Sequence, residues 1–370
     1  MDSFFDETKK ILVYDLDDGR ILFHQNEQVK TKVASLTKIM TTWLALENNS
    51  KDKKVKIEKT MLAGLEDFVT AGLFEGQEVS IEELCYISML PSAGDAAQAL
   101  AIATSGSIEK FVEKMNKKVD ELDLSATHFS NVVGFDEDND SSAEDIQKIL
   151  TTALKNPEFK NVFESFEYYS PSLDKVFKKT FENHDVISGG KTGFTYEAGR
   201  SLASTATIDG ANLLVVDLNE NWNSNDHIEN TLKIYDYYSK NYETKNVLNE
   251  GEEISTIQVK DSATKELKIF SNETVKRFLK NDEEVFYSFD GVSEINKNFS
   301  IGDYLGMYKI ETRNEVLYEK NFYLEEQIDF YPYWLWNGLV GSFVAVLAIA
   351  YAIVHRKKKC VSRRGRTNYS

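Results

Sequence analysis

The stretch Ala34-Ser35-Leu36-Thr37-Lys38-Ile39-Met40 begins a segment, residues 34–47, in which apolar residues recur at helical spacing. A separation of three residues places the Ser35 hydroxyl and the Lys38 ammonium on one face of a helix, within mutual reach. A lysine held in a partly dry cleft can lose its proton and then accept one from a serine. The stretch therefore predicts a helix whose start carries a nucleophile and its general base.

The Ser-x-x-Lys pattern is weak evidence by itself, because five other matches occur in the chain. The first match differs from the others because two further blocks come after it in order: Ser92 in PSAGD (91–95), then Lys191, Thr192 and Gly193 in GGKTG (189–193). A second serine can relay a proton to a leaving amine, and a Lys-Thr pair can bind a carboxylate. These parts together indicate an acyl-transfer site.

Two further features of such a site can be read from the same blocks. Gly193 would let a substrate backbone lie against the edge of a strand. The backbone N–H groups of Ser35 and Phe194 could form an oxyanion hole.

Four blocks carry a resemblance to a known family: 34–40 (ASLTKIM), 90–97 (LPSAGDAA), 127–131 (THFSN) and 191–199 (KTGFTYEAG). In these blocks and their order the chain resembles the penicillin-recognising serine enzymes, and most closely the D-alanyl-D-alanine carboxypeptidases of low molecular mass. The resemblance implies an α/β (α+β) catalytic domain of the serine β-lactamase/DD-peptidase kind. The order of catalytic domain, β-rich segment and terminal anchor in this chain is also similar to the family's usual layout.

The resemblance further implies a role for each matching residue. Ser35 would form the acyl-enzyme, Lys38 would be the general base, Ser92 would assist proton transfer, and Lys191 would recognise the terminal carboxylate, with Thr192 beside it. The substrate would be a peptidoglycan stem peptide ending in D-Ala-D-Ala, and β-lactams would acylate Ser35. The resemblance implies no metal and no organic cofactor.

The second block departs from the family's pattern. It ordinarily reads Ser-x-Asn, whereas Gly94 stands at the third place here, with room for a water molecule or a neighbouring side chain. We expect lowered activity, since the amide would otherwise contact the lysine base and the substrate backbone. A transpeptidase and a non-catalytic wall-binding protein remain open, while a β-lactamase is less favoured because no E-x-x-L-N motif lies between the second and third blocks.

Several other residues are of types that are common in active sites or metal sites, but we expect them to be structural or solvent-exposed here. We expect His128 to be structural, because the Ser-Lys arrangement leaves no role for an imidazole. Arg200 is expected to be solvated rather than a second carboxylate ligand, and the acidic run 136–140 (DEDND) to be a solvated loop, since it lacks the EF-hand pattern. Cys85 is expected to be a small core residue.

Alternating apolar residues predict β-hairpins at both ends of the first part of the chain, with helices between them. Strands at both ends suggest one α/β domain, residues 1–243, whose terminal strands share a sheet. Residues 244–330 contain short alternating runs and no cluster of catalytic groups, which predicts a small all-β domain that acts as a spacer or docking module.

The last part of the chain predicts a membrane anchor. Residues 334–354 contain no charge, and a basic tail, 355–370, follows them. Tyr331, Tyr333, Trp334 and Trp336 supply an aromatic belt at the start, so a transmembrane helix is predicted over 331–354. The positive-inside rule places this tail in the cytoplasm and residues 1–330 outside the cell membrane. An exterior domain needs a signal segment, and MDSFFDETKK contains none, so we expect the natural protein to begin upstream.

The net charge of −17 also limits the function. The tail contributes +7, so residues 1–354 carry −24. A body this acidic repels polyanions, which excludes nucleic acid as an expected partner.

Overall fold

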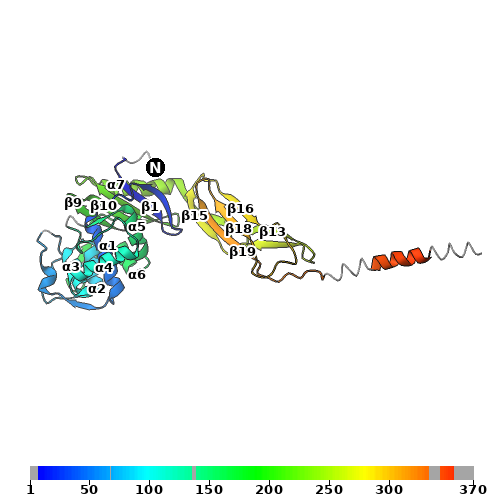
Figure 1. Cartoon of the computed structure of the whole chain (residues 1–370). Helices are drawn as coiled ribbons and strands as arrows, with labels where there is room; N and C mark the ends of the chain where they lie inside the picture. Colours follow the sequence, from blue (N-terminus) through cyan, green and yellow to red (C-terminus); the bar gives the residue numbers. More distant parts are fainter. Residues whose placement is uncertain (1–6, 67, 136–138, 333–341, 354–370) are drawn as a thin grey trace, which may run out of the picture. The chain divides into compact units, whose positions relative to one another are not determined.

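The computed structural model describes residues 7–66, 68–135, 139–332 and 342–353. The chain divides into two compact units (Figure 1). The first comprises Met1–Thr244 and Phe278–Asn281, and the second comprises Lys245–Arg277 and Asp282–Ser370. Each unit contains an apolar core of its own.

The centre of the first unit is a five-stranded antiparallel sheet in the order β2-β1-β11-β10-β9. Its strands are β1 (Lys10–Asp15), β2 (Arg20–Gln25), β9 (Ile187–Thr195), β10 (Gly199–Ile208) and β11 (Ala211–Glu220). Strands β1 and β11 pair directly, with Leu12 opposite Val216, so the two ends of this unit share one sheet as the sequence predicted. Strand β9, which carries the KTG block, lies at the end of the sheet.

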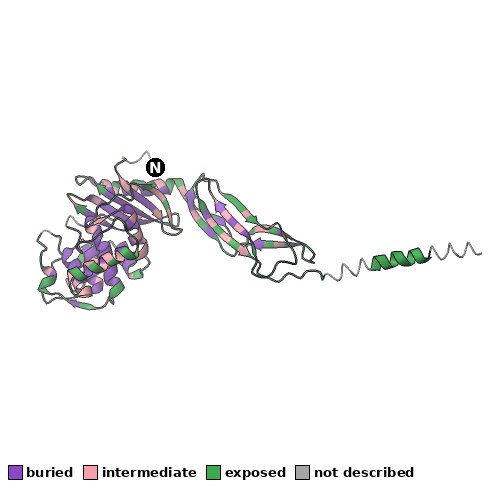
Figure 2. Ribbon diagram, viewed as in Figure 1, coloured by how far each residue is buried: buried purple, intermediate pink, exposed green. Residues whose placement is uncertain are grey.

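Alternating residues of the sheet supply two separate apolar cores. Leu12 and Val216 face the larger core, whereas Val13 and Val215 face the smaller one. This is the period-2 alternation of a strand, applied to a sheet that is covered on both faces. Figure 2 shows the resulting burial of these strands.

Helices of the first unit form the two covering layers. The smaller core is closed by α7 (Asp226–Asn241), and the larger core contains residues of the other helices. These are α1 (Thr37–Asn48), α2 (Ile81–Met89), α3 (Gly94–Ser105), α4 (Ile108–Glu121), α5 (Ala143–Ala153) and α6 (Pro157–Glu164), with 3-10 turns η1 (Ala34–Leu36) and η2 (Lys59–Leu62). Short strand pairs complete the unit: β3 (Thr31–Lys32) with β6 (Asp140–Ser141), β4 (Lys54–Lys56) with β5 (Glu78–Ser80), and β7 (Glu167–Ser170) with β8 (Lys175–Lys178).

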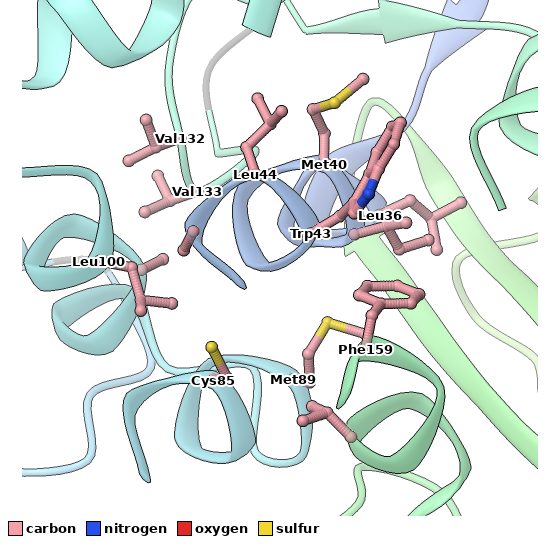
Figure 3. Packing of buried hydrophobic residues seen from close by; sticks show 14 of the residues in the cluster. Leu36, Met40, Trp43, Leu44, Cys85, Met89, Leu100, Val132, Val133 and Phe159 are labelled. Carbon is pink, nitrogen blue, oxygen red and sulfur yellow. The ribbon is translucent and has the colours of Figure 1, made fainter. Parts of the chain in front are cut away.

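Helix α1 is buried around its circumference, which fixes everything attached to its start. All residues from Thr37 to Leu46 are buried. In Figure 3, Met40 and Trp43 of α1 lie among the core side chains, and Cys85 of α2 is packed into the same cluster. Cys85 is fully buried, which raises the pKa of its thiol, and the prediction that it is a core residue is confirmed.

Strands make up most of the described part of the second unit. Two three-stranded sheets form it, β14-β13-β17 and β16-β18-β19, and β12 pairs with β15 where the two units meet along the chain. The bounds are β12 (Tyr242–Leu248), β13 (Glu253–Val259), β14 (Glu266–Phe270), β15 (Val275–Lys280), β16 (Phe286–Gly291), β17 (Glu294–Ile295), β18 (Tyr304–Glu311) and β19 (Val316–Tyr323). A small core that includes Ile257, Ile295 and Leu305 contains residues from both of these sheets.

The membrane span predicted at 331–354 is only partly covered by the structure. Residues 342–353 are helical, while 333–341 and 354 lie outside the described residues. Within the described part of the chain, no helix is long and apolar enough to cross a membrane.

Candidate active site

Ser35 lies in the 3-10 turn η1, directly before α1, and its turn is held from two sides. Ala34 has a left-handed backbone (φ +45°), a strained conformation for a residue with a side chain. A Cβ added to Gly134 would lie 1.9 Å from the Ala34 carbonyl oxygen, and one added to Gly193 of β9 would lie 2.7 Å from that of Val33. Only glycine permits backbones to approach so closely, so these two glycines fix the turn.

Lys38 lies one helical turn after Ser35 and points back toward it. Its Nζ donates to Ser35 Oγ at 3.1 Å and to the Val133 carbonyl at 2.6 Å. The side chain is 2 % exposed, and burial lowers the pKa of Lys38 to about 7. A lysine with this pKa is neutral in a large fraction of molecules near neutral pH, so it can accept a proton.

Ser92 and Lys191 form a second serine-lysine pair. Ser92 lies between α2 and α3 with a left-handed backbone (φ +65°). Lys191 Nζ donates to Ser92 Oγ at 2.9 Å and to the Thr192 carbonyl at 2.8 Å. Burial, together with the positive charges of Lys38 and Lys179, lowers the pKa of Lys191 well below its usual value. An arriving carboxylate would favour its charged form.

The remaining residues of the third block lie along β9. Thr192 Oγ1 is 2.6 Å from Thr180 Oγ1, and Gly193 is the point at which β9 meets the nucleophile turn. The Phe194 ring is 40 % exposed and stacks under the Arg200 guanidinium, whose carbon lies 4.8 Å from the ring centre. Arg200 Nε also donates to the Trp222 carbonyl. Arg200 is thus held beside Phe194 by a ring contact and a hydrogen bond to the backbone.

Sequence reasoning missed Asn139. Its side chain is 1 % exposed; Oδ1 accepts from the N–H groups of Ser130 and Asn131, and Nδ2 donates to Thr37 Oγ1 at 2.9 Å. Asn131 Oδ1 in turn accepts from the Val133 N–H. These bonds fix the loop whose Val133 carbonyl accepts from Lys38.

The acidic run 136–140 was predicted to be a solvated loop, and this prediction is wrong at its end. Asn139 is buried, and Asp140 forms ion pairs with Lys30 and Lys32, each at 3.1 Å. Residues 136–138 lie outside the described residues. The alternation of acidic residues gave no indication that an asparagine among them caps a neighbouring loop.

Lys179 was also missed. Its Nζ donates to the carbonyls of Phe163 (2.6 Å) and Gly190 (2.8 Å), and it lies over the rings of Phe163, Phe166 and Phe181. Burial lowers the pKa of Lys179 to about 7. Through Gly190, this lysine holds β9 immediately before Lys191.

The space at Gly94 is occupied by side chains rather than left open. Gly94 is buried, and a Cβ placed there would lie 3.2 Å from Phe68 Cδ1 and 3.3 Å from Leu65 Cδ2. Of the two occupants that the sequence suggested, a neighbouring side chain is therefore the one observed. The chain places apolar carbon where the family's motif has an amide.

The other candidates lie apart from this chemistry. His128 is exposed, and its backbone pairs with that of Asp140. Among the described residues, no group of three or more His, Cys, Asp or Glu side chains could hold a metal ion.

Comparisons with known proteins agree with this fold. Residues 6–221 match the family model Peptidase_S11, described as D-alanyl-D-alanine carboxypeptidase. The chain belongs to this family, and the resemblance seen in the motifs is confirmed.

Individual relatives support the same conclusion. D-alanyl-D-alanine carboxypeptidase DacF of Bacillus subtilis is 28% identical over 333 residues, which cover 85% of this chain and 84% of that protein. For DacA of Escherichia coli the identity is 29% over 215 residues, about half of each chain (54% and 53%). A crystal structure of a peptidoglycan synthesis regulatory factor (PBP3) from Streptococcus pneumoniae has the same fold, with a TM-score of 0.70, 20% identity and coverage of 88% and 100%.

Proposed function

We propose that the protein is a serine-type D-Ala-D-Ala carboxypeptidase that removes the terminal D-alanine from peptidoglycan stem peptides. The observation that carries the proposal is the contact between Lys38 Nζ and Ser35 Oγ, in which a buried lysine with a lowered pKa faces a serine on a strained turn. Family membership supplies the substrate class.

In the proposed reaction, neutral Lys38 takes the proton of Ser35 as Oγ attacks the carbonyl carbon of the penultimate D-alanine. The N–H groups of Ser35 and Phe194 would stabilise the oxyanion. The C–N bond then breaks, and the leaving amine receives a proton through Ser92. Water hydrolyses the resulting ester, which releases the shortened peptide and regenerates the Ser35 hydroxyl.

Recognition of the terminal carboxylate is assigned to Lys191 and Thr192. The Lys191 ammonium is nearly dry, at 1 % exposure, so a carboxylate brought to it gains strongly from charge pairing. Gly193 lets β9 pack closely against the turn that carries Ser35, so a substrate backbone that lies along β9 would come close to the nucleophile.

The parts beyond the catalytic unit receive proposals of their own. We assign catalysis to residues 1–243 and a spacer or docking role to the β-rich segment 244–330. The uncharged run 334–354 and the basic tail 355–370 support a single membrane anchor with the tail in the cytoplasm and the catalytic part outside.

The test measures D-alanine released from a stem pentapeptide that ends in D-Ala-D-Ala, with Ser35→Ala as the control. We expect one D-alanine per shortened peptide from the wild type and none from the variant. An added amine acceptor separates carboxypeptidase from transpeptidase, since a transpeptidase would form the amide product in preference to the acid. Absence of both products would favour a wall-binding protein without catalysis.

A further inference from the structure

The loop that covers Gly94 has a defined attachment to the second motif. The Gly94 N–H donates to the Val69 carbonyl at 2.7 Å, and the side chains of Leu65 and Phe68 lie directly over Gly94. Leu65 is 8 % exposed and Phe68 is half-buried. Leu65 is therefore buried against Gly94, whereas part of the Phe68 ring stays exposed to solvent.

Asp95 fixes this loop in place. Its carboxylate is 1 % exposed and accepts hydrogen bonds from the N–H groups of Ala71, Gly72 and Leu73, at 3.0–3.1 Å, as well as from Ala96. A buried carboxylate that accepts several backbone bonds is a strong local anchor. These hydrogen bonds hold the loop that follows Phe68 at the start of α3.

A second ring extends this surface toward the nucleophile. Phe68 packs on Phe135, with ring centres 4.6 Å apart, and Phe135 is 46 % exposed. Phe135 directly follows Gly134, the residue whose backbone touches that of Ala34. The two rings therefore connect the second motif, at Gly94, with the turn that carries Ser35.

We propose that Phe68 and Phe135 form an apolar wall between the second motif and the turn that carries Ser35, and that this wall binds an aromatic or branched apolar group on the acyl side of the substrate or β-lactam. The inference rests on the proposed function and makes it more specific. An amide at position 94 would offer hydrogen bonds, whereas these rings offer apolar contact area. Specificity then depends on the apolar character of the acyl group, since each buried methylene adds to binding.

The first test compares acylation by benzylpenicillin with acylation by 6-aminopenicillanic acid, which has the same ring system without the acyl group. The wild type is expected to prefer benzylpenicillin, and Phe68→Ala and Phe135→Ala should each lower this preference by about tenfold. Tyr169→Ala, at an exposed aromatic of β7, is the matched control and should leave the ratio unchanged. An unchanged ratio in both wall variants, or equal loss for the two ligands, would overturn the proposal.

The second test does not depend on catalysis. Binding of the same two compounds to Ser35→Ala, and to that variant with Phe68→Ala, is measured by ligand-observed NMR. Weaker binding of benzylpenicillin alone in the double variant supports the wall even if the wild type forms no acyl-enzyme, an outcome that would refute only the proposed function. Equal binding of benzylpenicillin to both proteins contradicts the wall.

Discussion

Two buried lysines of the first unit differ sharply from the exposed, ion-paired lysines of the second unit. In the first unit, Lys38 and Lys191 are 2 % and 1 % exposed, and their ammonium groups contact hydroxyl and carbonyl oxygens. In the second unit, Lys268 and Lys320 form ion pairs with Glu253 and Glu273 at 2.7 and 2.6 Å, and all four side chains are at least 30 % exposed. Burying an ammonium group in this way lowers the stability of the fold, whereas an exposed ion pair changes the stability very little.

This difference between buried and exposed lysines indicates which of them can take part in acid-base chemistry. Removing an ammonium group from water without a carboxylate partner disfavours its charged form, which is what lowers the pKa of Lys38. Groups with such shifted pKa values are concentrated at functional sites, although Lys179 shows that a buried lysine can also hold a strand in place. Exposed pairs contribute little to stability and carry no such implication.

The largest expected contrast is between lysine variants in the two units. Lys38→Ala should reduce the rate of acylation by a β-lactam by about 10²–10⁴, the range for losing a general base. Lys320→Ala should leave that rate unchanged. Stopped-flow acylation, with circular dichroism as a check on folding, measures both. Equal rates for Lys38→Ala and the wild type would show that Lys38 is not the general base.

Glycines with left-handed backbones allow a second comparison, within the first unit. Gly134 (φ +79°) and Gly76 (φ +87°) both resist a side chain, but only at Gly134 would a Cβ collide with the Ala34 carbonyl. Gly76→Ala should cost about 1 kcal/mol from backbone strain. Gly134→Ala should cost about 1–3 kcal/mol more and also slow acylation. Equal losses of unfolding free energy in urea would show that Gly134 does not clamp the nucleophile turn.

The pH dependence of acylation tests the lowered pKa itself. Lys38 must be neutral to accept the proton, so the rate should rise about tenfold per pH unit below pH 7 and level off above it. A lysine with an ordinary pKa would keep the rate rising to about pH 10. A profile measured from pH 5 to 9 separates these two cases. A flat profile would contradict a base with a pKa of about 7.

The smallest effect is expected at the exposed pairs of the second unit. Because the Glu253–Lys268 pair is solvated, a double-mutant cycle with Glu253→Ala and Lys268→Ala should give a coupling of at most about 1 kcal/mol. Thermal unfolding of the four proteins measures it. A coupling of several kcal/mol would show that this exposed pair does stabilise the second unit, contrary to the comparison drawn above.

Much of this architecture could be predicted from local patterns. The strands at 10–15 and 200–208 and the helix at 108–122 are predicted by alternation and by helical spacing, and the structure has them within one or two residues. Ser35, Lys38, Ser92 and Lys191 were identified by the order of their motifs, and the structure brings them together in two hydrogen-bonded pairs.

The contacts that the sequence did not indicate join distant segments. Asn139 reaches Thr37 across 102 positions, and Lys179 reaches Gly190 from a segment without a motif. Phe68 covers Gly94, and the loop that follows Phe68 is held there by hydrogen bonds to Gly94 and Asp95. No periodicity encodes such contacts, since each depends on how the chain packs.

The most direct test of Ser35 as the nucleophile is peptide mapping by mass spectrometry after exposure to benzylpenicillin. We expect one covalent adduct of the intact ligand's mass, on the peptide that contains Ser35, and no adduct in Ser35→Ala. An adduct on another residue, or none after long incubation at high concentration, would contradict the assignment of Ser35 as the acylated nucleophile.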